Sequence, residues 1–181
     1  MELPSQLMEN WCYEKEALSL FAKHYQTGEL IPMEWIDKIK AAGKFQQGMQ
    51  TLRQLSFGLL DMSWHGKNPT KIKCVKAHEK EVFSSTQLYP DVEENCMSTA
   101  FAHIFQGGYS SGYYSYKWAE VLDADAFAYF KTKHIFDTKI ANSLKHYILS
   151  QGGTENPFVL YKKFRGKDAS NKALLERAGL V

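Results

Sequence analysis

Apolar residues recur at three- and four-residue steps along most of this chain, which is the spacing of one face of an α-helix. The pattern predicts a first helix from Pro4 to Tyr25, ended by Gly28, and a second helix that opens at Pro32. After Gly43, a longer series of apolar residues predicts a helix with a core-facing side. The members of that series are Phe45, Met49, Leu52, Leu55, Leu59 and Met62.

The remainder of the chain also has helical periodicity, and no segment predicts a strand. An amphipathic, charged helix is predicted over residues 70–85, followed by a connector over residues 87–95. Further helices are predicted over residues 138–149, 154–164 and 170–178, with Thr154 and Ser170 as N-caps and Gly166 and Gly179 as helix ends. We therefore expect an all-α fold in which residues 1–181 form a single helical unit.

One segment combines helical periodicity with side chains that can take part in chemistry. Tyr109, Tyr113 and Tyr116 stand at positions i, i+4 and i+7, which would place their phenols on one face of a helix that continues toward Phe130. Converging phenols can donate hydrogen bonds to an oxyanion, although a tyrosine row at this spacing also suits a packing surface. Residues 107–112 are predicted to form a loop that leads into this helix, and its first two glycines let the backbone adopt positive φ and approach a ligand closely. The candidates in this segment are His103, Gly107, Gly108, Tyr109, Tyr113 and Tyr116.

Composition narrows the class of protein. A formal net charge of +2, with lysines scattered along the chain, offers no basic region for nucleic acid. Cys12, Cys74 and Cys96 lack disulfide or zinc-finger spacing, which predicts free thiols in a reducing compartment. No apolar run of about 20 residues suits a membrane span, and the N-terminus lacks the pattern of a signal peptide. We expect a cytoplasmic protein, with a periplasmic parent left open, that binds neither nucleic acid nor membrane.

Three stretches resemble one family of zinc metallopeptidases, which contains thimet oligopeptidase, oligopeptidase A and dipeptidyl carboxypeptidase. The segment from Phe101 to Trp118 is similar to the substrate-binding and oxyanion region of that family. Residues 2–11 resemble its E-x-P-S-Q-x-x-E-x-W element. Residues 151–157, 164–166 and 174–180 are similar to the end of the family's sequences. The resemblance therefore spans essentially the whole chain.

The resemblance implies hydrolysis of short peptides by a zinc-activated water, in a channel too narrow for folded proteins. Tyr113 and His103 would donate hydrogen bonds to the tetrahedral oxyanion. Tyr109 and Tyr116 would position the substrate. The two glycines, Gly107 and Gly108, would let the loop close over the peptide.

The sequence departs from the family at the zinc site. The resemblance makes Glu2 the third zinc ligand, but such an enzyme also needs two histidines in an H-E-x-x-H motif, whose glutamate is the general base. The nearest match, residues 78–82, has Val82 in place of the second histidine and is predicted to be a solvated helix face. One carboxylate cannot build the three-ligand site of catalytic zinc. We therefore expect that zinc belongs to the full-length parent, and that the isolated chain binds none and is inactive.

Two hypotheses about the protein remain open. In the first, the chain is the C-terminal portion of a larger zinc peptidase, whose missing N-terminal portion carries H-E-x-x-H. A shortened gene, a start codon placed too late or deliberate excision would each produce it, and a face meant for the missing portion would promote self-association. In the second, the chain is a non-catalytic helical module that binds peptides or other partners without metal.

Overall fold

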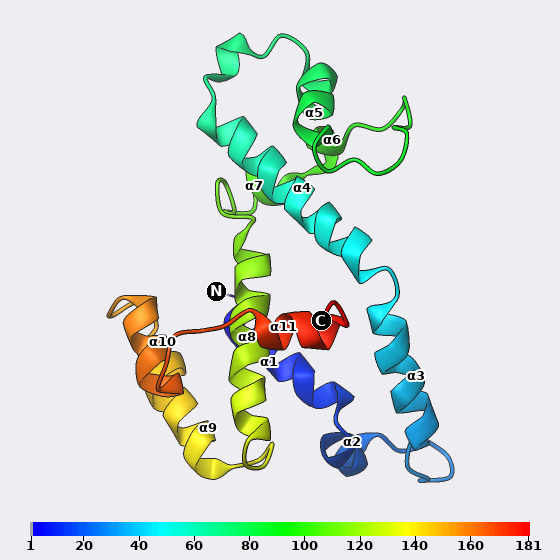
Figure 1. The fold of residues 1–181 in the computed structure, drawn as a ribbon, viewed down its shortest axis with the longest axis vertical. Coiled ribbons are helices and arrows are strands. Elements are labelled where there is room, and N and C mark those ends of the chain that lie inside the picture. The colour runs from blue at the N-terminus through cyan, green and yellow to red at the C-terminus, as the bar shows by residue number, and fades with distance from the viewer. Residues whose placement is uncertain (1) are drawn as a thin grey trace. The chain divides into compact units, whose positions relative to one another are not determined.

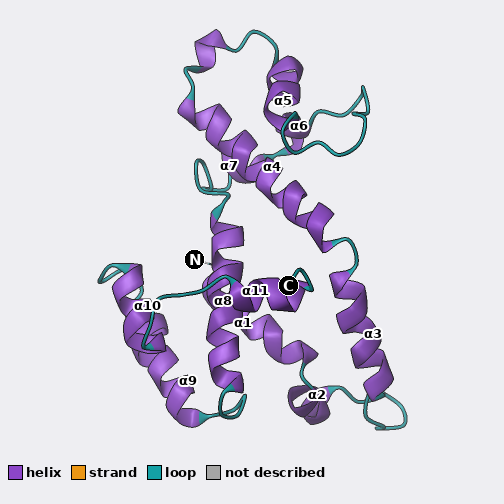
Figure 2. Ribbon diagram, viewed as in Figure 1, coloured by secondary structure: helices purple, strands orange, loops and turns teal. Residues whose placement is uncertain are grey.

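The computed structural model describes residues 2–181, and their regular structure is helical (Figure 1). Within this range there is no strand, only an isolated antiparallel bridge between Lys23 and Leu30 (Figure 2). The predicted all-α fold is therefore confirmed. None of the helices in the described range has both the length and the apolar character needed to cross a membrane.

The chain forms two compact units, residues 1–47 with 118–181, and residues 48–117. The first unit contains α1 (Leu3–Glu9), α2 (Lys15–Phe21), α3 (Met33–Lys44), most of α8 (Ser115–Lys131), α9 (Thr138–Leu144), α10 (Pro157–Arg165) and α11 (Lys172–Ala178). The second unit contains most of α4 (Gln47–Gly66), then α5 (Val75–Phe83), α6 (Met97–Ala100) and α7 (Ala102–Phe105). Short 3-10 turns cover Asn10–Tyr13 and Pro69–Lys71, and a π-helical turn covers Lys145–Leu149. That both units belong to one domain of a longer protein stays a prediction.

The first predicted helix, over residues 4–25, is wrong in its length, because α1, a 3-10 turn and α2 take its place. The Asn10 side chain donates to the carbonyl oxygens of Gln6 and Leu7, each at 3.1 Å, and competes there with helical hydrogen bonds. Glu14 then adopts extended backbone, with φ −103° and ψ 130°, before α2 begins. Local side-chain chemistry thus ends a helix that apolar periodicity alone would extend.

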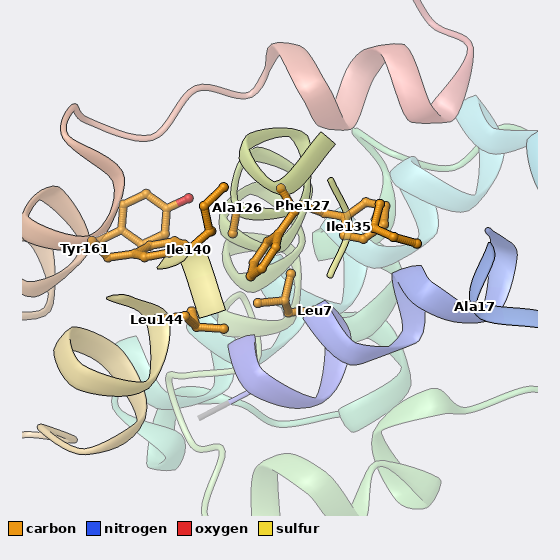
Figure 3. Close-up of a cluster of buried hydrophobic side chains, with 10 residues drawn as sticks. Leu7, Ala17, Ala126, Phe127, Ile135, Ile140, Leu144 and Tyr161 are labelled. Carbon is orange, nitrogen blue, oxygen red and sulfur yellow. The ribbon is translucent and has the colours of Figure 1, made fainter. Parts of the chain in front are cut away.

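The core of the first unit forms around α8 (Figure 3). Trp11 packs edge-on against Phe127 and Phe130, with ring centroids 4.8 and 5.1 Å apart, and its indole donates to the carbonyl of Ile135 at 3.0 Å. Leu7 on α1 is 1% exposed, and burial of a leucine stabilises a fold by roughly 2 kcal/mol. These contacts hold α1 in place. The buried members of this core are Leu7, Ala17, Ala126, Phe127, Phe130, Ile135, Ile140, Leu144, Tyr161 and Phe164.

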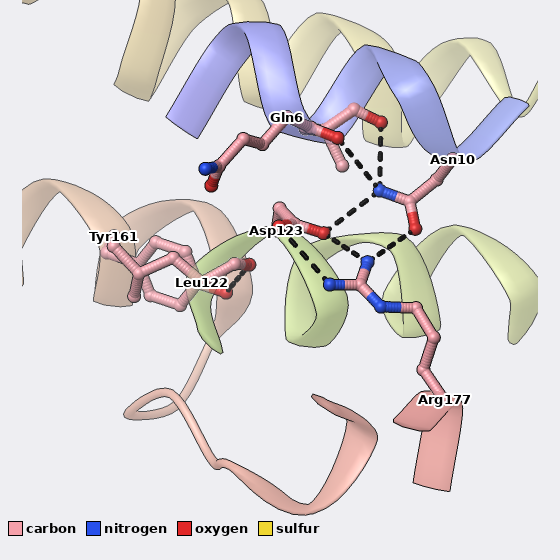
Figure 4. A network of polar contacts seen from close by, with 7 residues as sticks. Gln6, Asn10, Leu122, Asp123, Tyr161 and Arg177 are labelled. Carbon is pink, nitrogen blue, oxygen red and sulfur yellow. Dashed lines mark hydrogen bonds and ion pairs between the residues drawn. The ribbon is translucent and has the colours of Figure 1, made fainter. Parts of the chain in front are cut away.

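A polar network joins α1, α8 and α11 within the first unit (Figure 4). Asp123 is 1% exposed, and its Oδ1 accepts hydrogen bonds from the Asn10 amide at 3.0 Å and from the Arg177 guanidinium. Arg177 also donates to Oδ1 of Asn10 at 2.8 Å. Because a buried carboxylate is costly unless it is paired and hydrogen-bonded, the three side chains depend on one another. The network fixes the C-terminal end of α1.

Asparagine residues occupy the cap positions of the last two helices, which corrects one predicted N-cap and shifts the other. The Asn156 side chain accepts the amide of Phe158 at 2.9 Å, so α10 begins after it and Thr154 lies outside the helix. The hydroxyl of Ser170 does accept the amide of Lys172, at 3.2 Å, although it stands one position before the cap residue of α11. The predicted glycine ends are confirmed, with left-handed backbone at Gly166 (φ 78°) and Gly179 (φ 69°).

The predicted core-facing series of apolar residues is wrong for much of its length. Phe45 is 74% exposed, and on α4 Leu55, Leu59 and Met62 are 47%, 45% and 50% exposed. The buried face of α4 is the adjacent one, which also carries the fully buried Asp61. Because this face carries a charged residue, apolar spacing alone does not identify it as the buried one. The core of the second unit consists of Phe57, Leu60, Phe101 and Ile104.

The segment that most resembles a zinc motif, residues 78–82, is not the solvated helix face that the sequence predicts. His78 and Glu79 on α5 are only 6% and 7% exposed. The Glu79 carboxylate accepts two backbone amides at the start of α6, at 2.8 and 2.6 Å, which compensates its burial. His78 Nε2 lies 3.1 Å from Oγ of Ser63. Both residues therefore hold the second unit together.

Candidate functional site

The turn between α7 and α8 carries most of the candidate residues. His103 lies on α7, Tyr109 and Tyr113 lie in the turn, and Tyr116 lies at the start of α8, which begins at Ser115. The predicted common helical face is therefore wrong for the first two tyrosines, because the backbone takes positive φ at two positions of this turn.

The turn nevertheless brings these aromatic side chains together. The imidazole of His103 has its centroid 6.1 Å from the ring of Tyr109, 6.0 Å from that of Tyr113 and 6.4 Å from that of Tyr116. The rings of Tyr109 and Tyr116 are stacked at 5.2 Å, and those of Tyr113 and Tyr116 lie 5.1 Å apart. We call these four residues the aromatic cluster. They carry one imidazole and three phenols, which are all able to donate hydrogen bonds.

Both glycines of the turn meet a geometric requirement. A Cβ atom on Gly107 would stand 3.1 Å from the carbonyl oxygen of His103 and 3.2 Å from its Cα. Gly108 has φ +78°, which side-chain-bearing residues rarely adopt. The diglycine therefore lets the chain reverse closely against α7. A close approach of this backbone to a ligand stays a prediction.

Asp61 holds the turn from α4, and sequence reasoning missed it. Its side chain is fully buried, and its two carboxylate oxygens accept the backbone amides of Ser111 and Tyr113 at 2.8 and 2.9 Å. Nδ1 of His65, one helical turn further on, lies 2.9 Å from Oδ1 of the same carboxylate. The available signal was a lone acidic residue amid apolar neighbours, four residues before a histidine.

Tyr113 is the phenol most closely tied to the core. Its ring centroid lies 4.9 Å from that of Phe101 and 5.8 Å from that of Phe57. Burial raises the pKa of the Tyr113 hydroxyl, the phenol of Tyr116 raises it further, and the Arg53 guanidinium lowers it. A raised pKa keeps the phenol protonated, and therefore a hydrogen-bond donor, at neutral pH.

Glu2, the remaining candidate, belongs to the first unit and occupies the N-cap position of α1. Its carbonyl oxygen accepts the amide of Gln6 at 3.0 Å and the hydroxyl of Ser5 at 2.9 Å. Its side chain makes no capping hydrogen bond to α1. The helix and the polar network at its other end therefore set the place of this residue.

Residues 1–180 match the family model described as Peptidase family M3. The chain belongs to Peptidase family M3. It is 44% identical to oligopeptidase A of Escherichia coli and 42% identical to a probable cytosolic oligopeptidase A of Arabidopsis thaliana, over 99% and 100% of its own length. It is 30% identical to dipeptidyl carboxypeptidase of Escherichia coli, over 99% of its length. The chain spans only 26–27% of the length of these curated relatives.

Peptidase family M3 is zinc-dependent in general, so the donor atoms of this chain can be compared with the needs of zinc. A carboxylate is a suitable zinc ligand, and Glu2 fits as one member of such a site. Among residues 2–181, no group of three or more histidine, cysteine, aspartate or glutamate side chains is placed to hold a metal ion. Catalytic zinc normally has three protein ligands.

Proposed function

We propose that this chain is the part of a zinc peptidase that supplies one metal ligand and the hydrogen-bond donors for the scissile carbonyl of a short peptide. The observation that carries the proposal is the aromatic cluster, in which an imidazole and three phenols converge beside a diglycine turn. Membership of Peptidase family M3 supports the reaction class, and the names of the relatives, oligopeptidase A and dipeptidyl carboxypeptidase, support peptides as substrates.

Each residue of the cluster has a proposed role. Tyr113 and His103 donate hydrogen bonds to the oxyanion that forms when the peptide carbonyl is attacked, which lowers the barrier because charge develops there. Tyr109 and Tyr116, whose rings are stacked, position the substrate beside them. The diglycine allows the turn to close on the bound peptide.

Glu2 would bind zinc through its carboxylate, and the metal would polarise the carbonyl and activate a water molecule. The H-E-x-x-H motif, with two further ligands and the general base, is absent from residues 1–181 and would be supplied by another portion of the protein. We accordingly propose that the chain is inactive by itself. A cytoplasmic location and self-association remain predictions.

An exchange enzyme tests the proposed roles. This exchange enzyme is a chimera in which the present chain replaces the matching segment of Escherichia coli oligopeptidase A, with which it shares 44% identity. Tyr113→Phe and His103→Gln should each lower kcat by about 100- to 1,000-fold, the effect of removing an oxyanion donor. Tyr116→Phe should mainly raise KM, because it would weaken substrate positioning. Steady-state hydrolysis of a quenched fluorescent peptide measures both constants, and metal analysis should show zinc loss for Glu2→Gln.

Tyr114→Phe is the matched control, since Tyr114 is 57% exposed in the same turn but lies outside the cluster. Its kinetic constants should equal those of the exchange enzyme. Unchanged kcat in both Tyr113→Phe and His103→Gln would remove the proposed oxyanion role. Zinc-dependent hydrolysis by the isolated chain would refute its proposed inactivity.

A second candidate function is metal-free peptide binding by the chain alone. The aromatic cluster and Asp61 all lie within residues 48–117, so this surface is built without Glu2. Calorimetric titration of the isolated chain with short peptides, with and without a zinc chelator, separates the two functions. Binding that persists with chelator and is lost in the variant His103→Ala favours the binding module.

A further inference from the structure

We propose that Asp61 is the positioning residue of the candidate site: its carboxylate fixes the turn so that the Tyr113 hydroxyl lies where it can act together with His103. This inference rests on the function proposed for Tyr113. Asp61 itself would contact neither substrate nor metal, and would act only through the turn that it holds.

The Asp61 carboxylate is bound by two backbone amides of the turn, and Nδ1 of His65 lies 2.9 Å from its Oδ1. The side chain is fully buried, yet one oxygen accepts the amide of Ser111 at 2.8 Å and the other accepts the amide of Tyr113 at 2.9 Å. Hydrogen bonds to an ionised acceptor are about twice as strong as neutral ones. Because each oxygen takes one of two amides that are two residues apart, the carboxylate fixes both the position and the direction of this short segment.

The turn requires such an anchor. The amides of Ser111 and Tyr113 precede the first residue of α8 and are bound by this carboxylate rather than by helix carbonyls. Ser111 also has φ +55°, a left-handed conformation that is strained for a non-glycine residue. A strained turn persists only where its surroundings hold it, and Asp61 provides that restraint.

α4 also fixes the ring of the same tyrosine. Phe57 stands one helical turn before Asp61, and its ring meets that of Tyr113 edge-on at 5.8 Å. Between them, Gly58 lies against the following residue of the turn, and a Cβ atom there would be in ordinary contact with Cβ of Tyr114, at 3.8 Å. One face of α4 thus controls both the backbone and the side-chain direction of Tyr113.

A purely structural role would also make Asp61 important for stability, so the decisive test is a double-mutant cycle in the exchange enzyme. Asp61→Asn keeps the shape but turns an N–H group toward one of the two backbone amides. We expect kcat to fall by about tenfold or more, the equivalent of ~1.4 kcal/mol, with KM changed less than about twofold. If Asp61 acts through the Tyr113 hydroxyl, the same substitution in a Tyr113→Phe background should cause little further loss. An equal fold-loss in both backgrounds would overturn the proposal.

Glu79→Gln is the matched control, because Glu79 is a buried carboxylate of the same unit that also accepts two backbone amides. It should lower thermal stability without selective coupling to Tyr113. Equal coupling of both carboxylates to Tyr113 would overturn the proposal. Asp61→Glu, which keeps the charge one methylene further out, replaces Asp61→Asn in the cycle if that variant does not fold.

Amide hydrogen exchange in the isolated chain gives a readout that is independent of catalysis. Asp61→Asn should speed exchange at Ser111 and Tyr113 much more than in the neighbouring helices. Unchanged protection of these amides would overturn the positioning role. If Tyr113→Phe leaves kcat intact while Asp61→Asn exposes the amides, the function proposed for Tyr113 fails and the anchoring of the turn stands.

Discussion

Gly107 and Gly108 are adjacent but are required for different reasons. The first has no room for a side chain, because its Cβ would press against backbone atoms of His103 at 3.1 and 3.2 Å. The second has open space around it but a φ of +78°. A side chain at Gly107 would therefore displace His103, whereas a side chain at Gly108 would mainly lower the stability of the fold.

Alanine substitution should separate these two effects. Gly107→Ala should displace His103 and lower peptide hydrolysis in the exchange enzyme by about tenfold or more, since small misplacements at a site are costly. Gly108→Ala should cost about 1 kcal/mol of unfolding free energy and leave the His103 ring in place. The NMR chemical shifts of the His103 ring report its displacement, and thermal melting reports the loss of stability. Gly43→Ala is the control, because Gly43 lies in helical backbone with nothing within 4 Å of an added Cβ; this change should leave stability unchanged or raise it. If Gly107→Ala and Gly108→Ala shifted the His103 signals equally, the two glycines would not differ in the way described.

At the scale of single residues, the sequence identified the aromatic cluster better than it identified what supports it. His103, Tyr109 and Tyr116 lie close together, through a turn and not through a helical face. Asp61 escaped notice because the two groups in the turn that it binds are backbone amides, which carry no residue-specific signal in a sequence. The catalytic and positioning roles themselves stay predictions.

At the scale of helices, polar side chains decide where several elements end and what they contact. The network of Asn10, Asp123 and Arg177 joins α1 to α8 and α11. Apolar periodicity predicted that α8 continues toward Phe130, but it extended the first helix past Asn10 and selected the wrong face of α4. A side chain that bonds to its own helix, or a buried charge, breaks the link between periodicity and burial.

Removing the guanidinium from this network should destabilise the chain. In Arg177→Met the buried carboxylate of Asp123 loses its charged partner, and because Arg177 is 40% exposed, water offsets part of the loss. We expect the free energy of unfolding to fall by about 2 kcal/mol, measured by urea denaturation. Lys172→Met removes an exposed ion pair with Glu176 on the same helix, at 3.7 Å, and should change stability by less than about 0.5 kcal/mol. Equal losses in the two variants would show that Asp123 does not depend on its partner.

At the scale of the whole molecule, the family and the all-α class were evident from the sequence, because both rest on long patterns that tolerate local error. The division into residues 48–117 and the remainder was not predicted. Helical periodicity describes each helix by itself and carries no information about which helices share a core. The pairing of distant segments, such as Trp11 with Phe127, is set by tertiary packing.

The exposed apolar row on α4 has a consequence for the isolated chain. Leu55, Leu59 and Met62 lie at i, i+4 and i+7, each at least 45% exposed. Exposed apolar patches promote association, so we expect the chain to form dimers or larger species at micromolar concentration. The double variant Leu55→Glu/Leu59→Glu should be monomeric in sedimentation equilibrium, whereas Gln50→Glu, an exposed polar position of the same helix, should not change the association. A wild-type chain that stays monomeric throughout would contradict this expectation.

The arrangement of the two units along the chain sets an order for folding during synthesis. Residues 48–117 form one continuous stretch, so the aromatic cluster and Asp61 can assemble as soon as that stretch has left the ribosome. The first unit is discontinuous. Asn10 binds Asp123 and Arg177, which lie 113 and 167 residues further along the chain. Because synthesis proceeds at roughly 5–20 residues per second, Leu7 and Trp11 stay exposed for many seconds before the segments that bury them are made. During that time chaperones can bind these apolar side chains. Within residues 2–181, α1 is therefore synthesised well before the partners that hold it in place.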